Sequence, residues 1–315
     1  MPRTGSSHTH PLCLVEPGLK DHLSICALLS VLLSGWFIQA DAEPVQALDD
    51  THAQIQLSTP AQRIISLAPN LTEILFFIGA GDRVVGTVDH SDYPPAALQV
   101  PRVGSHSRFD FETILRLQPD LILAWESGNP AALVTRLEQL GLTVYRAEPA
   151  TLALIASTLA RIGKLTGNDK TANRLASQFL EEAESIRKTF YHKKLIRVFY
   201  QVWHDPLITL NGNHLVSRLL EDCGARNVFA NLPDIAPTVS RESVISRNPA
   251  AIIAGDGTGG SHRALDHWVN WDQVDAVANE RLYIVNSDHL HRHSPRILEG
   301  MRELCQVIDR ARGPG

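Results

Sequence analysis

The thirteen residues from Glu112 to Ala124, ETILRLQPDLILA, return in altered form from Glu242 to Ala254 as ESVISRNPAAIIA. In each copy a glutamate precedes a proline by seven positions, and an apolar run ending in alanine follows. Helical spacing before the proline and an apolar run after it indicate a helix followed by a buried strand. Because the phrase occurs once in each half of the chain, in register over 13 positions, it predicts two lobes of similar architecture.

Strand-like apolar runs alternate with helical patterns on both sides of this repeat. The expected strands are 64–67, 84–88, 121–124 and 143–145 in the first half, and 196–202, 251–254 and 282–285 in the second. The expected helices are 71–78, 111–117, 130–140, 215–221 and 295–310. Such alternation is typical of an α/β fold with parallel-type sheets.

Between the two halves the pattern is helical from Leu152 to about Lys193, with one break at 167–169. The part from Lys170 to Tyr191 contains no Gly or Pro, which predicts one helix of about 22 residues and roughly 33 Å. Two similar lobes bridged by one long, rigid helix are typical of proteins that hold a ligand between lobes, outside the carboxyl ends of the strands. A single helical connection resists bending, so we expect little closure on ligand binding.

The N-terminal segment carries an apolar run, Ile25 to Ile38, that is too short to cross a bilayer comfortably. The Ala40-Asp41-Ala42 that follows matches a secretory cleavage pattern. We therefore predict a soluble exported protein cleaved after Ala42, with a core helix or a retained anchor as the alternative. The predicted organisation is a signal peptide (1–42), an N-terminal extension (43–60), an α/β lobe (61–150), a helical linker (151–194) and a second α/β lobe (195–315).

Composition favours a globular protein, with 44% hydrophobic and 20% charged residues. The 34 acidic residues outnumber the 29 basic ones, which argues against a nucleic-acid partner because such proteins present a basic face. Beyond residue 42 only two cysteines occur, Cys223 and Cys305. An even pair in an exported protein indicates a disulfide, and two free buried thiols are the alternative.

Polar and aromatic side chains gather in the segments that follow the predicted strands. They are Pro69 and Asn70, His90 and Tyr93, Trp125, Trp203, and the run Asp288, His289, Leu290, His291 and Arg292. Because parallel strands place their carboxyl ends at one edge, these residues are expected on one face, where an aromatic cleft suits a large, flat organic ligand. The alternatives are that the tryptophans are ordinary core residues and that Asp92–Pro95 is only a rigid turn.

Three histidines alternate after the last strand, His289, His291 and His293. In an extended segment they would share one face and could bind a metal, whereas solvated loop histidines are the other interpretation. His267, Trp268 and Trp271 are expected in a surface helix near the rim of the cleft. The chain contains no G-x-S-x-G, H-E-x-x-H or P-loop motif, so catalysis has little support.

Glu112 and Glu242 occupy equivalent places in the repeat, near the starts of the predicted helices. An acidic residue is favoured there by the helix dipole alone. A matched pair, one in each lobe, equally suits docking onto a symmetric partner that presents basic residues. Docking through these two glutamates is the interpretation that we prefer.

The chain resembles a known family at these residues. The segments Arg63–Glu73, Ser91–Pro95, Pro119–Trp125 and Val239–Glu242 are similar to those of the periplasmic cobalamin-binding proteins of ABC importers, which are substrate-binding proteins with a helical backbone. The resemblance covers residues 60 to 310 approximately. The phrase PDLI is shared with binding proteins for siderophores and haem, whereas SDYPP together with AWESGN is more specific to the cobalamin branch.

The resemblance implies a monomeric periplasmic solute-binding protein, not an enzyme and without a cofactor. It would capture cobalamin or a related corrinoid and deliver it to the permease dimer of an importer in the inner membrane. The resemblance also implies a disulfide between Cys223 and Cys305, and permease arginines opposite Glu112 and Glu242. Trp125 would pack on the corrin, and the loop from 288 to 292 would contact the ligand.

Two departures from the family pattern replace aromatic rings by imidazole. His90 stands where the family has a tyrosine, and His289-Leu290 stands where it has an aromatic pair. Imidazole binds cobalt or iron, so a different corrinoid or haem is a further ligand hypothesis. A binding protein of the same class for haem or a ferric siderophore is the runner-up. The hypothesis from a different class is an exported metal-binding protein or enzyme that uses the three histidines after the last strand.

Overall fold

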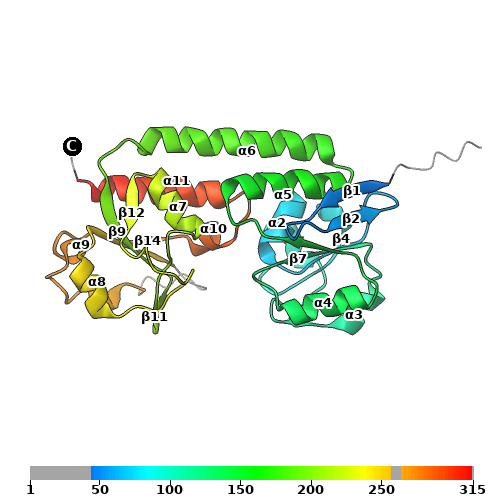
Figure 1. The fold of residues 1–315 in the computed structure, drawn as a ribbon, viewed down its shortest axis with the longest axis horizontal. Coiled ribbons are helices and arrows are strands. Elements are labelled where there is room, and N and C mark those ends of the chain that lie inside the picture. The colour runs from blue at the N-terminus through cyan, green and yellow to red at the C-terminus, as the bar shows by residue number, and fades with distance from the viewer. Residues whose placement is uncertain (1–43, 257–263, 314–315) are drawn as a thin grey trace, which may run out of the picture. The chain divides into compact units, whose positions relative to one another are not determined.

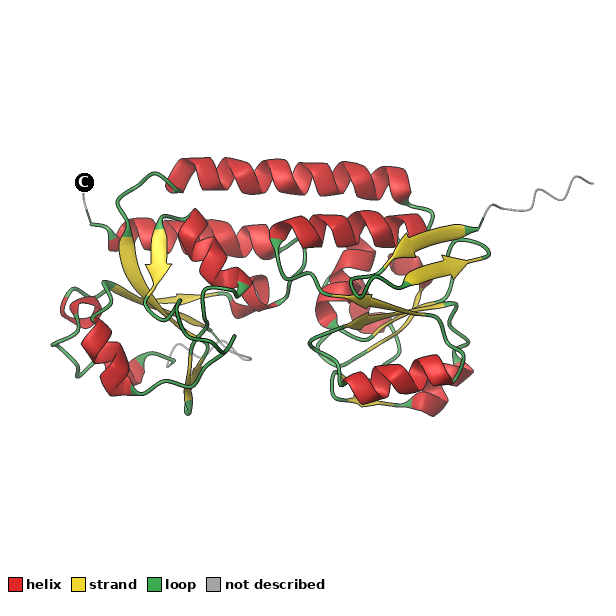
Figure 2. Ribbon diagram, in the orientation of Figure 1, coloured by secondary structure: helices red, strands yellow, loops and turns green. Residues whose placement is uncertain are grey.

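The computed structural model describes residues 44–256 and 264–313. Two α/β lobes, each with its own parallel sheet, pack on the same side of a layer of long helices (Figures 1 and 2). The two-lobe α/β architecture expected from the repeat is therefore confirmed. The signal peptide expected over residues 1–42 lies outside the described residues.

The two sheets have the same topology. In the N-terminal lobe the order is β4 (Val84–Thr87), β3 (Ile64–Ser66), β7 (Leu121–Trp125), β8 (Val144–Ala147), and in the C-terminal lobe it is β12 (Ala225–Asn227), β9 (Ile196–Gln201), β13 (Ala251–Gly255), β14 (Leu282–Val285). Every neighbouring pair in both sheets is parallel. In each lobe the second strand in chain order lies on one side of the first, and the third and fourth lie on the other.

The repeated phrase builds the same local structure twice. It forms α3 (Phe111–Arg116) before β7 and α8 (Arg241–Arg247) before β13. A side chain caps each helix, because Asp110 accepts a hydrogen bond from the amide of Thr113 and Ser240 from that of Ser243. The residue before each proline has a left-handed backbone, with φ of 46° at 118 and 41° at 248, so each helix ends there and the strand begins.

A continuous helix joins the two lobes. Helix α6 (Asp169–Phe190) lies along α5 (Leu152–Leu165) of the N-terminal lobe and α11 (Ile297–Ala311) of the C-terminal lobe (Figure 1). Its buried residues repeat every three or four positions, Ala172, Ala176, Phe179, Ala183 and Ile186. They belong to one buried apolar cluster that contains residues of both sheets, so the two lobes share part of one core.

The remaining elements are short and flank this framework. The helices are α2 (Pro69–Phe77), α4 (Ala131–Gln139), α7 (Leu215–Asp222), α9 (Asp275–Ala278) and α10 (Ser287–His291), with single turns η1 (Gly81–Arg83), η2 (Pro95–Gln99) and η3 (Asp266–Trp268). The hairpins are β1 (Val45–Leu48) with β2 (Gln54–Leu57), β5 (Gly104–Ser105) with β6 (Arg108–Phe109), and β10 (Trp203–His204) with β11 (Leu207–Ile208). Among the helices described here, none is long and apolar enough to cross a membrane.

The segment treated above as an extension packs on the N-terminal lobe. The β1–β2 hairpin buries Ile55 and Leu57 in the shared core. Between its strands, Asp50 forms an ion pair with Arg161 of α5, with 2.6 Å between Oδ1 and Nη2. Residues 45–57 thus form part of the surface of this lobe.

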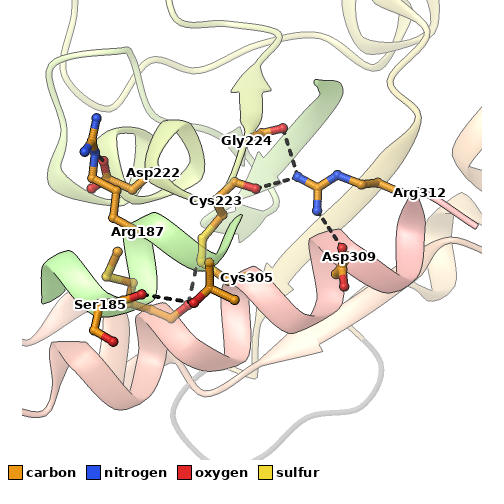
Figure 3. The surroundings of a disulfide bond; sticks show 10 residues. Ser185, Arg187, Asp222, Cys223, Gly224, Cys305, Asp309 and Arg312 are labelled. Atoms are coloured by element: carbon orange, nitrogen blue, oxygen red, sulfur yellow. Dashed lines mark hydrogen bonds and ion pairs between the residues drawn. A yellow bond between two sulfur atoms is a disulfide. The ribbon is translucent and has the colours of Figure 1, made fainter. Parts of the chain in front are cut away.

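A disulfide joins Cys223, at the end of α7, to Cys305 in α11 (Figure 3). Both cysteines are fully buried. Close by, the guanidinium of Arg312 donates hydrogen bonds to the carbonyl oxygens of Cys223 and Gly224, at 2.5 and 3.1 Å, and pairs with Asp309. The predicted disulfide is confirmed, and it ties the last helix to the C-terminal lobe.

Replacing both cysteines, Cys223→Ala with Cys305→Ala, should lower the free energy of unfolding by about 4 kcal/mol. The physical reason is that the disulfide closes a loop with a sequence separation of 82 residues, which restricts the unfolded chain. Urea unfolding followed by circular dichroism measures the loss. Wild type reduced with dithiothreitol is the control and should match the double variant. Equal urea midpoints for oxidised and reduced wild type would contradict this expectation.

Candidate functional site at the lobe interface

The carboxyl ends of the two sheets meet residues of the opposite lobe. On the N-terminal side these are Glu73 of α2, Asp92 after β4 and Trp125 at the end of β7. On the C-terminal side they come from α10 and from the segment 292–296 that joins α10 to α11. Parallel strands bring these loops to one edge of each sheet, which explains why residues so distant in sequence are in contact.

Five charged residues form an ion-pair cluster across the interface, called here the interlobe cluster: Glu73, Asp92, Asp288, Arg292 and Arg296. Arg292 Nη1 lies 2.5 Å from Asp92 Oδ1 and 3.3 Å from Glu73 Oε1. Its Nη2 lies 3.0 Å from Asp288 Oδ2. Arg296 donates to both carboxylate oxygens of Glu73, with 3.0 Å between Nε and Oε2. The hydroxyl of Ser294 also donates to Glu73.

Burial makes this cluster stronger than a surface salt bridge. The side chain of Glu73 is 2% exposed, and those of Arg292 and Arg296 are 13% and 14% exposed. Burial alone would raise the pKa of Asp92, but the hydrogen bond and charge of Arg292 outweigh it and hold this pKa below its usual value. Asp92 is therefore ionised although its side chain is 46% exposed, whereas the contacts at Glu73 are buried and little screened by solvent.

Trp125 is held in one orientation at the same interface. Its Nε1 lies 3.4 Å from Glu148 Oε1, and its backbone amide donates to Asn129 Oδ1 at 2.7 Å. A Cβ at Gly128 would stand 2.1 Å from the indole, so only glycine lets the turn fold under the ring. The ring remains half-buried and faces the imidazole of His293, with 6.0 Å between centroids.

Three histidines of the C-terminal lobe have lowered pKa values, and one of them, His293, faces Trp125. Burial, followed by the charges of neighbouring histidines, lowers the pKa of His214 to about 3 and that of His293 to about 4. Burial also lowers the pKa of His291, whose Nε2 lies 3.0 Å from the Tyr200 hydroxyl. Trp125 therefore faces the neutral imidazole of His293, while its Nε1 lies 3.4 Å from Glu148 Oε1.

The extended segment that would align His289, His291 and His293 is not formed. Asn286 caps α10 by accepting from the amide of His289, so residues 287–291 are helical and the rings diverge. His289 contacts Glu299, with 3.4 Å between Nε2 and Oε2, while the other two contact Tyr200 and Trp125. Within residues 44–256 and 264–313, no group of three His, Cys, Asp or Glu side chains is placed to hold a metal ion.

Several predicted residues lie at the strand ends without a contact across the interface. Pro69 begins α2, and beside it Asn70 is buried, with neither atom of its amide hydrogen-bonded. His90 is exposed in a left-handed conformation, with φ of 63°. Trp203 is 48% exposed and donates its Nε1 to the carbonyl of Asp205.

Tyr93 differs, because it touches the interlobe cluster. The guanidinium of Arg296 lies 3.9 Å from its ring centroid, which is a close cation–π contact across the interface. Tyr93 is also 42% exposed, so its ring has a free side.

Two residues are placed differently from what the sequence predicts. Leu290 is fully buried and packs on α11, where a Cβ at Gly300 would lie 2.8 Å from it, so it cannot contact a ligand. Trp268 is fully buried too, in the core of the C-terminal lobe and not in a surface helix. Its indole tolerates burial because Nε1 donates to Gln201 Oε1 at 2.8 Å. His267 and Trp271 beside it are half-buried.

The sequence pattern does not point to Glu73, Ser294 or Arg296. The available signal is that Glu73 stands between apolar residues in α2, where Leu71, Ile74 and Leu75 are all fully buried. A charged residue amid such neighbours requires a buried partner, but the sequence does not say where that partner lies.

A cavity of about 450 Å³ adjoins the interlobe cluster. Its walls come from α2, α6, the Tyr93–Pro94 pair and the start of α11. Phe76, Phe77 and Phe179 give it a partly apolar lining, and Glu73, Tyr93 and Arg296 of the interface line it as well. Apolar packing is consequently incomplete on this side of the cluster.

Comparison with known proteins identifies the family. A family model described as periplasmic binding protein matches residues 64–289. The chain belongs to the periplasmic binding protein family. This family member is 36% identical over 251 residues to the vitamin B12-binding protein of Vibrio cholerae serotype O1, which covers 79% of this chain and 90% of that protein. It is 34% identical over 255 residues to the vitamin B12-binding protein of Yersinia pestis, over 80% and 89% of the two chains.

Solved structures agree with this assignment. The crystal structure of the periplasmic vitamin B12 binding protein BtuF of Vibrio cholerae matches with a TM-score of 0.75 and 35% identity, over 81% of this chain and 99% of that one. The periplasmic haem-binding protein BhuT in complex with two haems matches with a TM-score of 0.71 and 20% identity, over 79% and 98%. The second likeness concerns the fold alone.

Acidification should destabilise this binding protein. The folded pKa values of His214 and His293, about 3 and about 4, lie below the ordinary 6.5. Below pH 6.5 the unfolded chain therefore binds more protons than the folded one, and stability falls as the pH falls toward the folded pKa values. From pH 6.5 to pH 5 we expect a loss of about 2 kcal/mol for each histidine.

Urea unfolding at pH 7 and pH 5 measures this difference. His293→Gln should shrink it, whereas His192→Gln, at an exposed position after α6, is the matched control and should not. The same free energy of unfolding at both pH values would disprove the assignment of neutral histidines.

Proposed function

We propose that this chain binds cobalamin or a related corrinoid between its lobes and delivers it to an ABC importer. The observation that carries the proposal is the identity of 36% over 251 residues to a protein named for vitamin B12 binding. The relatives of this chain are binding proteins, so capture and release of a ligand is the activity to explain. A corrinoid brings its own cobalt, and the chain then needs only shape, stacking and hydrogen bonds.

The residues at the strand ends suit a flat macrocycle. Trp125 offers an indole that its neighbours already hold in place, so little side-chain freedom is lost on stacking. Two further exposed rings follow strands of the sheets, His90 in the lobe of Trp125 and Trp203 in the other lobe. Both offer additional ring surface. Asp288 and Arg292 supply polar groups for the amides at the edge of a corrin.

Haem or a ferric siderophore is the second candidate. It is favoured by the exposed imidazoles of His90 and His204, which are the ligand type that iron accepts. Either candidate keeps the same fold and the same route of delivery.

Export to the periplasm is part of the proposal. The cleavage pattern at Ala40–Ala42 supports secretion, and the disulfide supports an oxidising compartment because such bonds persist there. We propose that the chain acts as a monomer in that compartment.

Docking to the importer would use Glu112 and Glu242. Each is the second residue of a capped helix, and the two helices, α3 and α8, are equivalent in the two lobes. The side chain of Glu112 is 89% exposed, and Glu242 is exposed as well. Hydrogen bonds at the start of α8 hold the pKa of Glu242 below its usual value, which keeps it charged. Two exposed carboxylates in equivalent settings match a partner with two equivalent basic sites.

Trp125→Ala should weaken binding of cyanocobalamin by about 2 kcal/mol, or roughly 30-fold in Kd, because the macrocycle loses a stacking surface. Isothermal titration calorimetry of residues 43–315 measures the change. Tyr191→Ala is the control, since Tyr191 is exposed at the end of α6. Folded wild type that binds no corrinoid would overturn the proposed function, and a haem absorbance spectrum under the same conditions would favour the second candidate.

Glu112→Ala with Glu242→Ala should leave the Kd for the corrinoid unchanged and reduce ATP-driven uptake at least about tenfold, because the importer loses two ion pairs. Uptake by vesicles that contain the importer measures this. The control is Glu181→Ala with Glu221→Ala, two exposed glutamates outside α3 and α8. Loss of ligand affinity in the first pair would instead make these glutamates part of the binding site.

A further inference from the structure

Glu73 of the N-terminal lobe accepts hydrogen bonds from the segment 292–296 of the C-terminal lobe. We infer that Glu73 is a positioning residue that sets the spacing of the two lobes before ligand arrives, and with it the distance between the docking helices α3 and α8. This inference rests on the proposed function for its consequences in transport, but the spacing itself can be measured without ligand.

The contacts of Glu73 all reach one short segment of the other lobe. Its carboxylate accepts from Arg292, Ser294 and Arg296, which lie within five consecutive residues between α10 and α11. Both oxygens are used, and Arg296 binds in the two-pronged manner that fixes direction as well as distance. A small relative movement of the lobes would therefore break several hydrogen bonds at once.

The environment makes these contacts costly to lose. Glu73 is 2% exposed, so loss of its donors would leave a buried carboxylate without hydrogen bonds. Asp92 and Asp288 hold Arg292 from the sides, and Tyr93 lies beneath Arg296. Asp92 and Tyr93 lie in the same lobe as Glu73 and add to its hold on the two arginines, whereas Asp288 holds Arg292 from its own lobe.

Apolar packing does not replace the ionic contact on this side. Helix α6 and the shared core hold the lobes along the helical layer. Next to Glu73 lies the cavity of about 450 Å³, which leaves the wall between α2 and the start of α11 incompletely packed. Apolar packing therefore holds the lobes together at the helical layer, and the hydrogen bonds of Glu73 hold them together nearer the strand ends.

The same contact orients the segment that carries Asp288 and Arg292. Residues 292–296 follow α10 directly, and Ser294 and Arg296 anchor them to Glu73. Loss of the hydrogen bonds to Glu73 would therefore allow the lobe spacing to vary and residues 292–296 to move. We therefore expect weaker ligand binding as well as a wider range of lobe spacings when Glu73 cannot bind the arginines.

The test is a distance measurement between the lobes in Glu73→Gln. Nitroxide labels at Arg116→Cys and Ser246→Cys, exposed positions on α3 and α8, report the spacing by pulsed electron paramagnetic resonance. Wild type should give one narrow distance distribution without ligand, and Glu73→Gln a clearly broader one. The Kd for cyanocobalamin should rise roughly tenfold. Glu299→Gln is the matched control, because Glu299 borders the same cavity but its carboxylate, among the described residues, contacts the imidazole of His289.

An unchanged distance distribution in Glu73→Gln overturns the inference, even if the variant is less stable, because a purely structural role would lower the midpoint of thermal unfolding without moving the labels. If Glu73→Gln fails to fold, Arg296→Lys and Ser294→Ala weaken the same contact while keeping Glu73 paired with Arg292, and they carry the same expectation. A wild type that binds no corrinoid defeats the proposed function but leaves the distance result as it stands.

Discussion

The packing of α6 along α5 and α11 is the contact on which the rest of the molecule depends. A Cβ added at Gly163 of α5 would stand 2.1 Å from that of Ala172 in α6, so a larger residue there would push α6 away from the N-terminal lobe. Small residues in this seam bring one helix into the core of both lobes. The relative position of the two sheets along the helical layer follows from this packing.

Because both sheets have the same strand order, elements of the two lobes come in equivalent pairs. Helices α3 and α8 each follow a polar cap and precede a left-handed residue and a proline. The glutamates at their second positions therefore lie in equivalent settings on the two lobes. A rigid frame turns this equivalence into a fixed spacing, and a fixed spacing is what a symmetric partner can recognise.

The repeat, the sheet strands and the bridging helix could be predicted because each depends on a local pattern. The apolar runs after Pro119 and Pro249 can be recognised in the sequence without knowing which residues pack against them in the fold. The roles of Glu73 and Leu290 could not be predicted in this way. Glu73 is buried only because arginines about 220 positions later reach it. Leu290 is buried because Asn286 caps a turn of helix and directs it toward α11.

The charges at the interface bear on the class of ligand. In the interlobe cluster the two arginines contact three carboxylate side chains, so each arginine is already paired with an acidic residue. Around Trp125, burial keeps His214 and His293 neutral. An anionic ligand such as a ferric catecholate siderophore needs unpaired positive charge, because a buried charge without a partner is costly. Both arginines of the interlobe cluster are already paired, whereas the uncharged amides of a corrin require only hydrogen bonds and an aromatic surface.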